Sequence, residues 1–184
     1  DVLEFGAGSG VLAVQVLFEL GRLKSLPKKY YIMELSGQLK QQQKKTILSV
    51  LPELIDRVEW LTELPISFSG VVIANELLDA IPAKRLIFSD GRFVELGVDF
   101  FDGNFQWKPL DEPYSNSLTS LPVICEEGYT TEVNLQALAW IDSLYSAMTE
   151  GTVLLIDYGM DRNEYHHPQR KDGTLRCHYR HKAS

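Results

Sequence analysis

Acidic side chains follow three apolar runs of this chain, and together they could bind a cationic ligand. Glu4 ends the first run, Glu34 ends the second, and Asn75, Glu76 and Asp79 follow the third. Several carboxylates near one cavity are costly unless they face a positive group. Paired carboxylates can also hold a guanidinium in bidentate fashion and accept a proton from it. The chemistry expected from these residues is therefore cation binding with proton transfer.

Glycines stand at alternate positions, Gly6, Gly8 and Gly10, and Glu4 lies two residues before the first of them. A strand, a glycine turn and a helix start form a nucleotide-type crevice, because backbone and free N–H groups approach the ligand closely. The dinucleotide fingerprint needs its last glycine where this chain has Val11, and the Glu4 carboxylate would repel a pyrophosphate. The pattern favours a ligand with an ammonium group and no phosphates, such as S-adenosylmethionine, over a nicotinamide cofactor. A tight structural turn is the alternative.

Two further residues have positions that suit an adenosine. Glu34 ends the second expected strand, where an acid can accept hydrogen bonds from both ribose hydroxyls. Trp60 lies near the end of the third expected strand and could lie against an adenine face. The alternatives are an exposed strand-end charge for Glu34 and a core or rim tryptophan for Trp60. Asn75 could likewise cap a short helix, with acids in its first turn.

The elements that must position these residues alternate between strands and helices. Alternation of this kind predicts an α/β fold with a parallel sheet and right-handed crossovers. The expected helices begin after Gly10, after Ser36 and at a Thr131 cap, and end near Gly21, Pro52 and Gly151. The expected strands are 1–5, 30–34, 57–61, 70–74 and 153–157.

Residues 84–131 consist of β-rich runs separated by turn signals, which predicts an antiparallel β insertion after the fourth strand. Asp90-Gly91 and Asp102-Gly103 separate three β-rich runs, and Asp-Gly between strands is a strong hairpin signal. The segment 114–121 that follows is expected to be mobile. Residues 160–184 form a polar, basic tail.

Composition limits the class of protein. The length of 184 residues fits one domain, 1–184, and the net charge of −7 argues against nucleic acid as a partner. No apolar run is long enough to span a bilayer, so we expect no membrane contact. Cys125 and Cys177 are too far apart in sequence to suggest a disulfide framework and fit a reducing compartment. Cys177, His178 and His181 do not make a known zinc spacing, so no metal is expected. The chain opens inside a strand and closes without a final element, so we expect an incomplete domain.

Four stretches resemble the MidA family, also called DUF185, of class I S-adenosylmethionine-dependent methyltransferases. The stretches are Val2–Gly10, Ala74–Pro82, Leu155–Gly159 and Gly173–Arg176. The resemblance implies a Rossmann-like class I methyltransferase sheet, mostly parallel, with helices on both faces. Family members also have a helical segment before the glycine motif and strands after the last stretch. The resemblance assigns cofactor contacts to five residues, Glu4, Gly6, Gly8, Gly10 and Glu34. It also places Asn75, Glu76 and Asp79 at the reaction cleft.

The mitochondrial member of that family is a protein arginine methyltransferase that acts on a respiratory complex I subunit. The resemblance therefore implies a protein substrate, in the bacterial cytoplasm or, for a eukaryotic chain, in the mitochondrial matrix. Glu76 and Asp79 are the candidates that bind the guanidinium and accept its proton, with Glu132 in reserve. The alternative function is a non-catalytic assembly factor that binds S-adenosylmethionine and holds a partner. The oligomeric state is left open.

Overall fold

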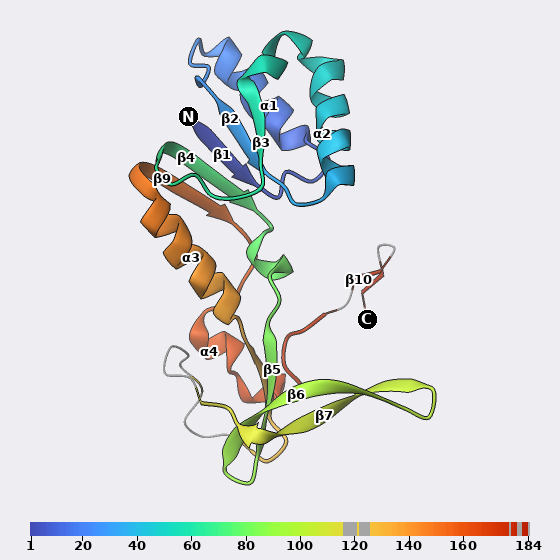
Figure 1. Ribbon diagram of the computed structural model, residues 1–184. Helices are drawn as coiled ribbons and strands as arrows, with labels where there is room; N and C mark the ends of the chain where they lie inside the picture. The colour runs from blue at the N-terminus through green and yellow to red at the C-terminus, as the bar shows by residue number, and fades with distance from the viewer. Residues whose placement is uncertain (116–120, 122–125, 177, 180–181, 184) are drawn as a thin grey trace. The chain divides into compact units, whose positions relative to one another are not determined.

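The structure is a computed structural model that describes residues 1–115, 121, 126–176, 178–179 and 182–183 (Figure 1). Its contacts divide the chain into two compact units. The first contains Asp1–Ala80 and Trp140–Tyr158, and the second contains Ile81–Ala139 and Gly159–Ser184. The expectation of a single domain stays a prediction.

The first unit is built on a five-stranded sheet in which every pair of neighbours is parallel. The chain runs outward from the centre through β2 and β3, then returns to the other side of β1, which creates a topological switch point between β1 and β4. The strand order is β3 (Val58–Leu61), β2 (Tyr30–Met33), β1 (Val2–Phe5), β4 (Phe68–Asn75) and β9 (Met148–Ile156).

Helices cover both faces of this sheet (Figure 1), as the sequence predicted. α1 (Val11–Arg22) and α2 (Gly37–Val50) pack on one face, where Leu17 and Ile47 are fully buried against Tyr30 and Ile32. α3 (Leu135–Ala147) packs on the other face through Leu144 and Trp140. Alternate residues of β1 supply the two cores, because successive strand side chains point to opposite faces.

Local chemistry explains where α2 begins and ends. The Ser36 hydroxyl accepts a hydrogen bond from the Leu39 N–H at 3.3 Å and caps the helix. Pro52 cannot continue an α-helix, so the chain passes into a short 3₁₀ helix, η1 (Pro52–Arg57), before β3. Both features match the sequence prediction.

The second unit contains a four-stranded antiparallel sheet, ordered β7, β6, β5, β8. Three of its strands are the predicted ones, β5 (Lys84–Ser89), β6 (Arg92–Phe101) and β7 (Asn104–Pro113). The two Asp-Gly turns join them, and all four turn residues have positive φ. β8 (Thr130–Val133) is a fourth strand that the sequence did not predict.

Two predicted helix boundaries are wrong. Thr131 lies inside β8, where it is buried, and Asn134 caps α3 instead by accepting the Ala137 N–H at 2.8 Å. Gly151 does not end the helix, because α3 leads directly into β9 and Gly151 lies within that strand. A Cβ at Gly151 would overlap the carbonyl oxygen of Gly70 on β4, so close strand approach explains this glycine.

The tail of the chain contains short elements in its described part. These are α4 (Arg162–Tyr165), the 3₁₀ turn η3 (Pro168–Arg170), and the paired strands β10 (His178–Tyr179) and β11 (Lys182–Ala183). The segment expected to be mobile, 114–121, falls mostly on residues outside the described part. No helix among the described residues is long and apolar enough to cross a membrane.

Candidate functional site

The candidate residues of the first unit follow strands whose carboxyl ends are in register. Phe5 pairs with Met33 on one side and with Ala74 on the other, and Asn75 pairs with Ile156. The glycine loop, Glu34, Glu76 and Asp157 therefore leave neighbouring strands along one edge of the sheet. Ligands of open α/β sheets bind at this edge, next to the switch point.

The glycine loop has the backbone that the motif predicted. Gly6, Gly8 and Gly10 have φ values of 63°, 52° and 83°, in the left-handed region that favours glycine. A Cβ on Gly8 would meet no atom within 4 Å, whereas one on Gly10 would lie 3.0 Å from the Gln43 Cα. Gly10 is also the N-cap of α1 and has no side chain to accept a hydrogen bond. The first N–H groups of α1 therefore donate to no capping side chain. Gly8 leaves room for a ligand, and Gly10 lets α2 approach.

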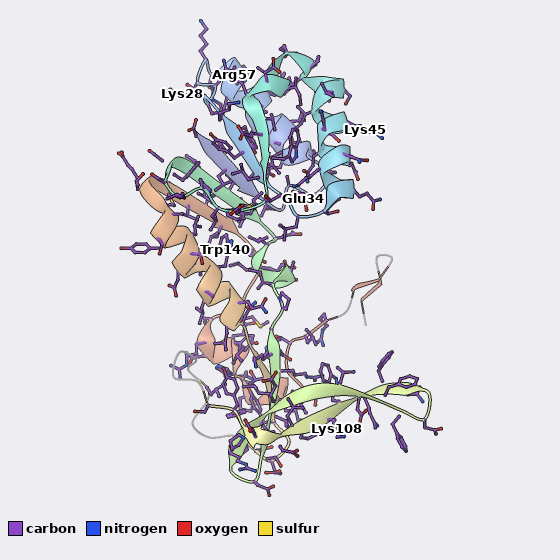
Figure 2. All side chains as sticks on the ribbon, viewed as in Figure 1. Lys28, Glu34, Lys45, Arg57, Lys108 and Trp140 are labelled. Atoms are coloured by element: carbon purple, nitrogen blue, oxygen red, sulfur yellow. The ribbon has the colours of Figure 1, made fainter. Side chains whose placement is uncertain are left out.

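Glu34 is buried at the end of β2, with only 8% of its surface exposed (Figure 2). Its Oε1 accepts the Ser36 N–H at 2.9 Å, and its Oε2 accepts the side-chain amide of Gln43 at 3.0 Å. A carboxylate can accept about four hydrogen bonds. Two acceptor positions remain, which matches the two hydroxyls of a ribose.

Gln43 connects three candidate cofactor residues, and sequence reasoning missed it. This side chain is fully buried on α2. Its Nε2 donates to Gly8 O at 3.1 Å and to Glu34 Oε2, while its Oε1 accepts the Trp60 Nε1–H at 2.9 Å. The Lys- and Gln-rich run around it indicated a solvated helix face. The signal that could have found it is its spacing of four from Leu39 and from Ile47.

Trp60 is partly buried beside the core under α1 and α2. Its only indole N–H is used by Gln43, so any contact with an adenine would be through the ring face. That contact stays a prediction.

Glu4 lies on the same face of the sheet as α1 and α2, with 2% of its surface exposed. Its Oε2 accepts the Tyr30 hydroxyl at 2.7 Å. Burial raises the pKa of Glu4, and the Tyr30 bond opposes that shift. Burial also raises the pKa of Tyr30, together with the charge of Glu4 and the bond to it. Among the described residues, Glu4 thus has a hydrogen bond from Tyr30 and no cationic partner, which is the arrangement expected of an acid that binds a positive ligand.

The exposed candidates lie beyond β4. Asn75 ends that strand, and Glu76 has a left-handed backbone with φ of 46°. Asp79 accepts the Tyr158 hydroxyl at 2.7 Å, and Asp157 accepts the Leu78 and Asp79 N–H groups. The structure therefore brings Glu76 and Asp79 onto one short loop, with partners from the end of β9.

Glu132, the reserve carboxylate, lies in the second unit and is engaged there. Its Oε2 accepts the Thr174 N–H at 2.8 Å and the Thr174 hydroxyl at 3.1 Å, and Arg85 Nε lies 3.7 Å from Oε1. These contacts tie β8 to the Thr-Leu-Arg stretch of the tail. They indicate an internal structural role for this residue.

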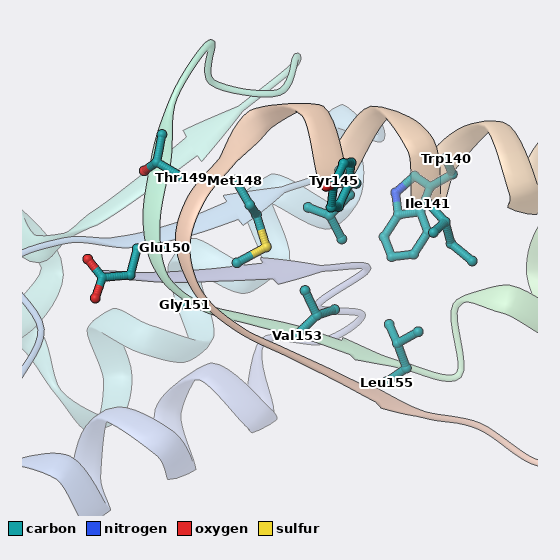
Figure 3. Close-up of a pocket in the computed structure, with 10 residues that line it drawn as sticks. Trp140, Ile141, Tyr145, Met148, Thr149, Glu150, Gly151, Val153 and Leu155 are labelled. Atoms are coloured by element: carbon teal, nitrogen blue, oxygen red, sulfur yellow. The ribbon is translucent and has the colours of Figure 1, made fainter.

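The residues at the sheet edge fit S-adenosylmethionine. The Gly8 backbone has open space beside it, Glu34 keeps two acceptor positions, and Glu4 is a buried acid with no cationic partner among the described residues. A separate pocket of about 410 Å³ lies along α3 and β9 (Figure 3), lined mainly by apolar groups such as Trp140, Met148 and Val153. It contains none of the candidate residues, and its lining does not suit a charged cofactor. Among the described residues no group of three His, Cys, Asp or Glu side chains could hold a metal ion, and Cys177 and His181 lie outside that part of the chain.

Replacing Glu4 by glutamine should stabilise the fold at neutral pH. The amide oxygen still accepts the Tyr30 hydroxyl, but the side chain no longer ionises. Because burial raises the pKa of Glu4 above its usual value, the folded protein binds this proton more tightly than the unfolded chain. Wild-type stability should therefore fall as pH rises from about 4.5 through the folded pKa. Glu4→Gln should remove this fall, so the variant should be more stable than the wild type at pH 7.

Urea unfolding between pH 4.5 and 8 measures this difference. The control is Glu63→Gln, since Glu63 is exposed, and its profile should follow the wild type. A Glu4→Gln variant that is less stable than wild type at pH 7 would contradict the account of the Glu4 carboxylate.

Comparisons with known proteins identify the family to which the chain belongs. A family model described as "Putative S-adenosyl-L-methionine-dependent methyltransferase" matches residues 1–184. A native crystal structure of a COG1565 superfamily protein from Burkholderia thailandensis matches at TM-score 0.90 and 38% identity, over 100% of this chain and 50% of that one. A COG1565 member from the same organism bound to S-adenosyl-homocysteine matches at TM-score 0.90 and 38% identity, over 99% and 48%. None of the curated proteins matches this chain.

The chain thus spans about half the length of the two structures it matches. The observed fold, a parallel sheet between helices with a separate antiparallel sheet, is the predicted methyltransferase fold, and the predicted cofactor, S-adenosylmethionine, is confirmed at the level of the family. The chain belongs to this family of S-adenosyl-L-methionine-dependent methyltransferases.

Proposed function

We propose that this chain carries the cofactor-binding and catalytic residues of a methyltransferase that modifies arginine side chains of a protein. The observation that carries the proposal is the pair Glu76 and Asp79. Both are exposed carboxylates on a loop that leaves β4 at the same sheet edge as the glycine loop. Two acids presented there suit a cationic acceptor better than a neutral one.

The cofactor would be held by residues that the sheet register brings to one edge. The Gly8 backbone would face its methionine part, Glu4 would pair with the ammonium, and Glu34 would accept the two ribose hydroxyls. Trp60 would contact the adenine by its ring face, and Asn75 would lie at the reaction side. When bound, S-adenosylmethionine supplies an electrophilic methyl group on a sulfonium.

Glu76 and Asp79 would act on the acceptor. A guanidinium is a poor nucleophile because its lone pairs are delocalised and it stays protonated at neutral pH. The two carboxylates would bind it, orient one nitrogen toward the methyl group and accept the proton that this nitrogen loses.

The second unit supports a protein rather than a small molecule as the acceptor. β6 and β7 form a long two-stranded ribbon (Figure 1), and residues opposite each other on such a ribbon share a face. One face carries Val98 opposite Trp107 and Phe100 opposite Phe105, and these side chains are 63%, 45%, 62% and 79% exposed. The other face carries the Asp99–Lys108 ion pair and the exposed side chain of Phe101. Exposed apolar side chains gathered on one ribbon are typical of a protein-binding surface, and a subunit of a respiratory complex is one candidate acceptor.

The same apolar face favours the second candidate function, a non-catalytic assembly factor that binds S-adenosylmethionine and holds a partner. The two functions differ in turnover. An assembly factor would bind the cofactor without transferring its methyl group.

Replacing Gln43 should weaken cofactor binding. Gln43→Ala removes the bonds that hold Gly8 O, Glu34 and Trp60, so we expect the affinity for S-adenosyl-homocysteine to fall about tenfold, the scale of one or two such bonds. Calorimetric titration at a temperature where the variant is folded measures it. Gln42→Ala is the matched control, because Gln42 is the exposed neighbour and should change affinity less than about twofold. Equal affinities for the two variants would contradict the role given to Gln43.

Incubation of the full-length protein with methyl-labelled S-adenosylmethionine and a proteome extract tests the proposed reaction. Mass spectrometry of the labelled proteins should find methylated arginine. Glu76→Gln keeps the shape of the side chain but cannot accept the proton, so incorporation should fall on the order of 100-fold or more while affinity for S-adenosyl-homocysteine is retained. Label on another residue type would exclude the arginine acceptor, and full activity of Glu76→Gln would exclude its catalytic role. Binding without any transfer would favour the assembly factor.

A further inference from the structure

Residues 76–80 form a loop, here called the acceptor loop. Asp157 and Tyr158, the first two residues beyond β9, make hydrogen bonds that hold this loop. β4 and β9 are parallel neighbours, and Asn75 pairs with Ile156. The register continues one step further, since the Glu76 N–H donates to Ile156 O at 2.8 Å. Asp157 and the acceptor loop therefore leave adjacent strands side by side.

Asp157 binds the backbone of the acceptor loop with one carboxylate oxygen. Its Oδ2 accepts the Leu78 N–H at 2.9 Å and the Asp79 N–H at 3.4 Å, at the start of the 3₁₀ turn η2 (Leu78–Ala80). The other oxygen, Oδ1, is buried without a hydrogen-bond partner among the described residues. A carboxylate kept in this position at a desolvation cost indicates that its contacts with the loop are needed.

The acceptor loop has a backbone that must be held from outside. Glu76 has φ of 46°, and a left-handed conformation is strained for a residue other than glycine. Such a conformation persists only where surrounding contacts determine it. Two contacts from the end of β9 hold it: the Ile156 carbonyl accepts the Glu76 N–H itself, and the Asp157 carboxylate accepts the Leu78 N–H two residues later.

Tyr158 orients the second acid of the pair. Its hydroxyl donates to Asp79 Oδ2 at 2.7 Å. This bond, followed by desolvation and by the charges of Asp79, Asp157 and Glu76, raises the pKa of Tyr158 above its usual range. The phenol therefore remains a donor at neutral pH and fixes one oxygen of Asp79.

We propose that Asp157 and Tyr158 are positioning residues for methyl transfer: Asp157 fixes the backbone of the acceptor loop, and Tyr158 fixes the Asp79 carboxylate. This inference rests on the proposed function, because it assigns the pair a task only if Glu76 and Asp79 bind the acceptor. Neither residue contacts the glycine loop, Glu34 or Gln43 in any hydrogen bond of the described residues. The pair should therefore affect transfer without affecting the cofactor.

The test compares Asp157→Ala, Asp157→Asn and Tyr158→Phe in the full-length protein. Asp142→Ala and Tyr145→Phe are the matched controls, since both side chains are exposed on α3 and Tyr145 is 82% exposed. The readouts are amide hydrogen exchange at Leu78 and Asp79, affinity for S-adenosyl-homocysteine, and incorporation of labelled methyl into extract proteins.

Asp157→Ala should raise exchange at both amides about tenfold or more and lower incorporation on the order of 100-fold, the cost of a displaced reacting group. Asp157→Asn keeps an acceptor oxygen, so its amide exchange and its methyl incorporation should lie between those of Asp157→Ala and the wild type. Tyr158→Phe should lower incorporation about fivefold and leave the exchange unchanged. Affinity for S-adenosyl-homocysteine should stay within about twofold in every variant.

A phenol titration adds a readout that a purely structural role would not move. The ultraviolet difference between wild type and Tyr158→Phe should show a phenol that ionises above the usual value of about 10, and Asp79→Asn should lower it. Wild-type incorporation in Asp157→Ala, or a loss of cofactor affinity that parallels the loss of transfer, would overturn the proposal. If the wild type itself transfers no methyl group, the proposed function fails and this inference fails with it. If the wild type transfers methyl groups and the Asp157 and Tyr158 variants do so equally well, only the inference about Asp157 and Tyr158 fails.

Discussion

The first unit depends on the in-register parallel pairing of β1 with β2 on one side and β4 on the other. Side chains of a strand alternate between faces, so the register decides that Glu4 lies on the α1 and α2 face while Leu3 and Phe5 pack toward α3. A slip of one residue would exchange those faces and shift the glycine loop along the edge. Fully buried neighbours such as Tyr30 and Val72 make such a slip costly. The same pairing that forms the core therefore aligns the acids.

Two buried acids in this arrangement are supported very differently. Glu34 receives two N–H donors, from Ser36 and Gln43, and is held by α2. Glu4 has the Tyr30 hydroxyl, and burial raises its pKa. A fold optimised for stability alone would not keep an acid in the position of Glu4, whereas a site for a cationic ligand gains from it. The two acids therefore differ in their support: Glu34 is held by two N–H donors, whereas Glu4 has the Tyr30 hydroxyl and no cationic partner among the described residues.

Much of the fold follows from short-range patterns that the sequence displays. The Asp-Gly turns, the Ser36 cap and the apolar strands are set by neighbouring residues, and all of them appear in the structure. The glycine spacing likewise indicated the ligand class. The errors come from long-range contacts. Gly151 is required by the approach of β4, not by a helix end, and β8 is buried through pairing with β5, which made Thr131 unusable as a cap.

The candidate site shows the same limit more clearly. Glu4, Glu34, Glu76 and Asp79 could be named because each follows an apolar run, and the register then placed those runs together. Gln43 contacts Gly8 across 35 positions of sequence, and Asp157 contacts Leu78 across 79. No local pattern marks a polar residue as a partner over such distances. The residues that support a site are therefore harder to find from sequence than the residues that form it.

Gln43 and Asp157, which support the two sides of the site, also differ in when their contacts can form during folding. The cofactor half of the site uses β1, β2, β3, α1 and α2, all within the first 61 residues. The acceptor loop needs Asp157, which follows the second unit's residues 81–139 in sequence. Closing a longer loop costs more conformational entropy, although the cost grows slowly with length. The glycine loop with Gln43 and Glu34 can thus order from contacts within the first 61 residues, whereas the strained Glu76 backbone is fixed only when β9 has joined β4. The order of these contacts links the acceptor side of the site to completion of the sheet.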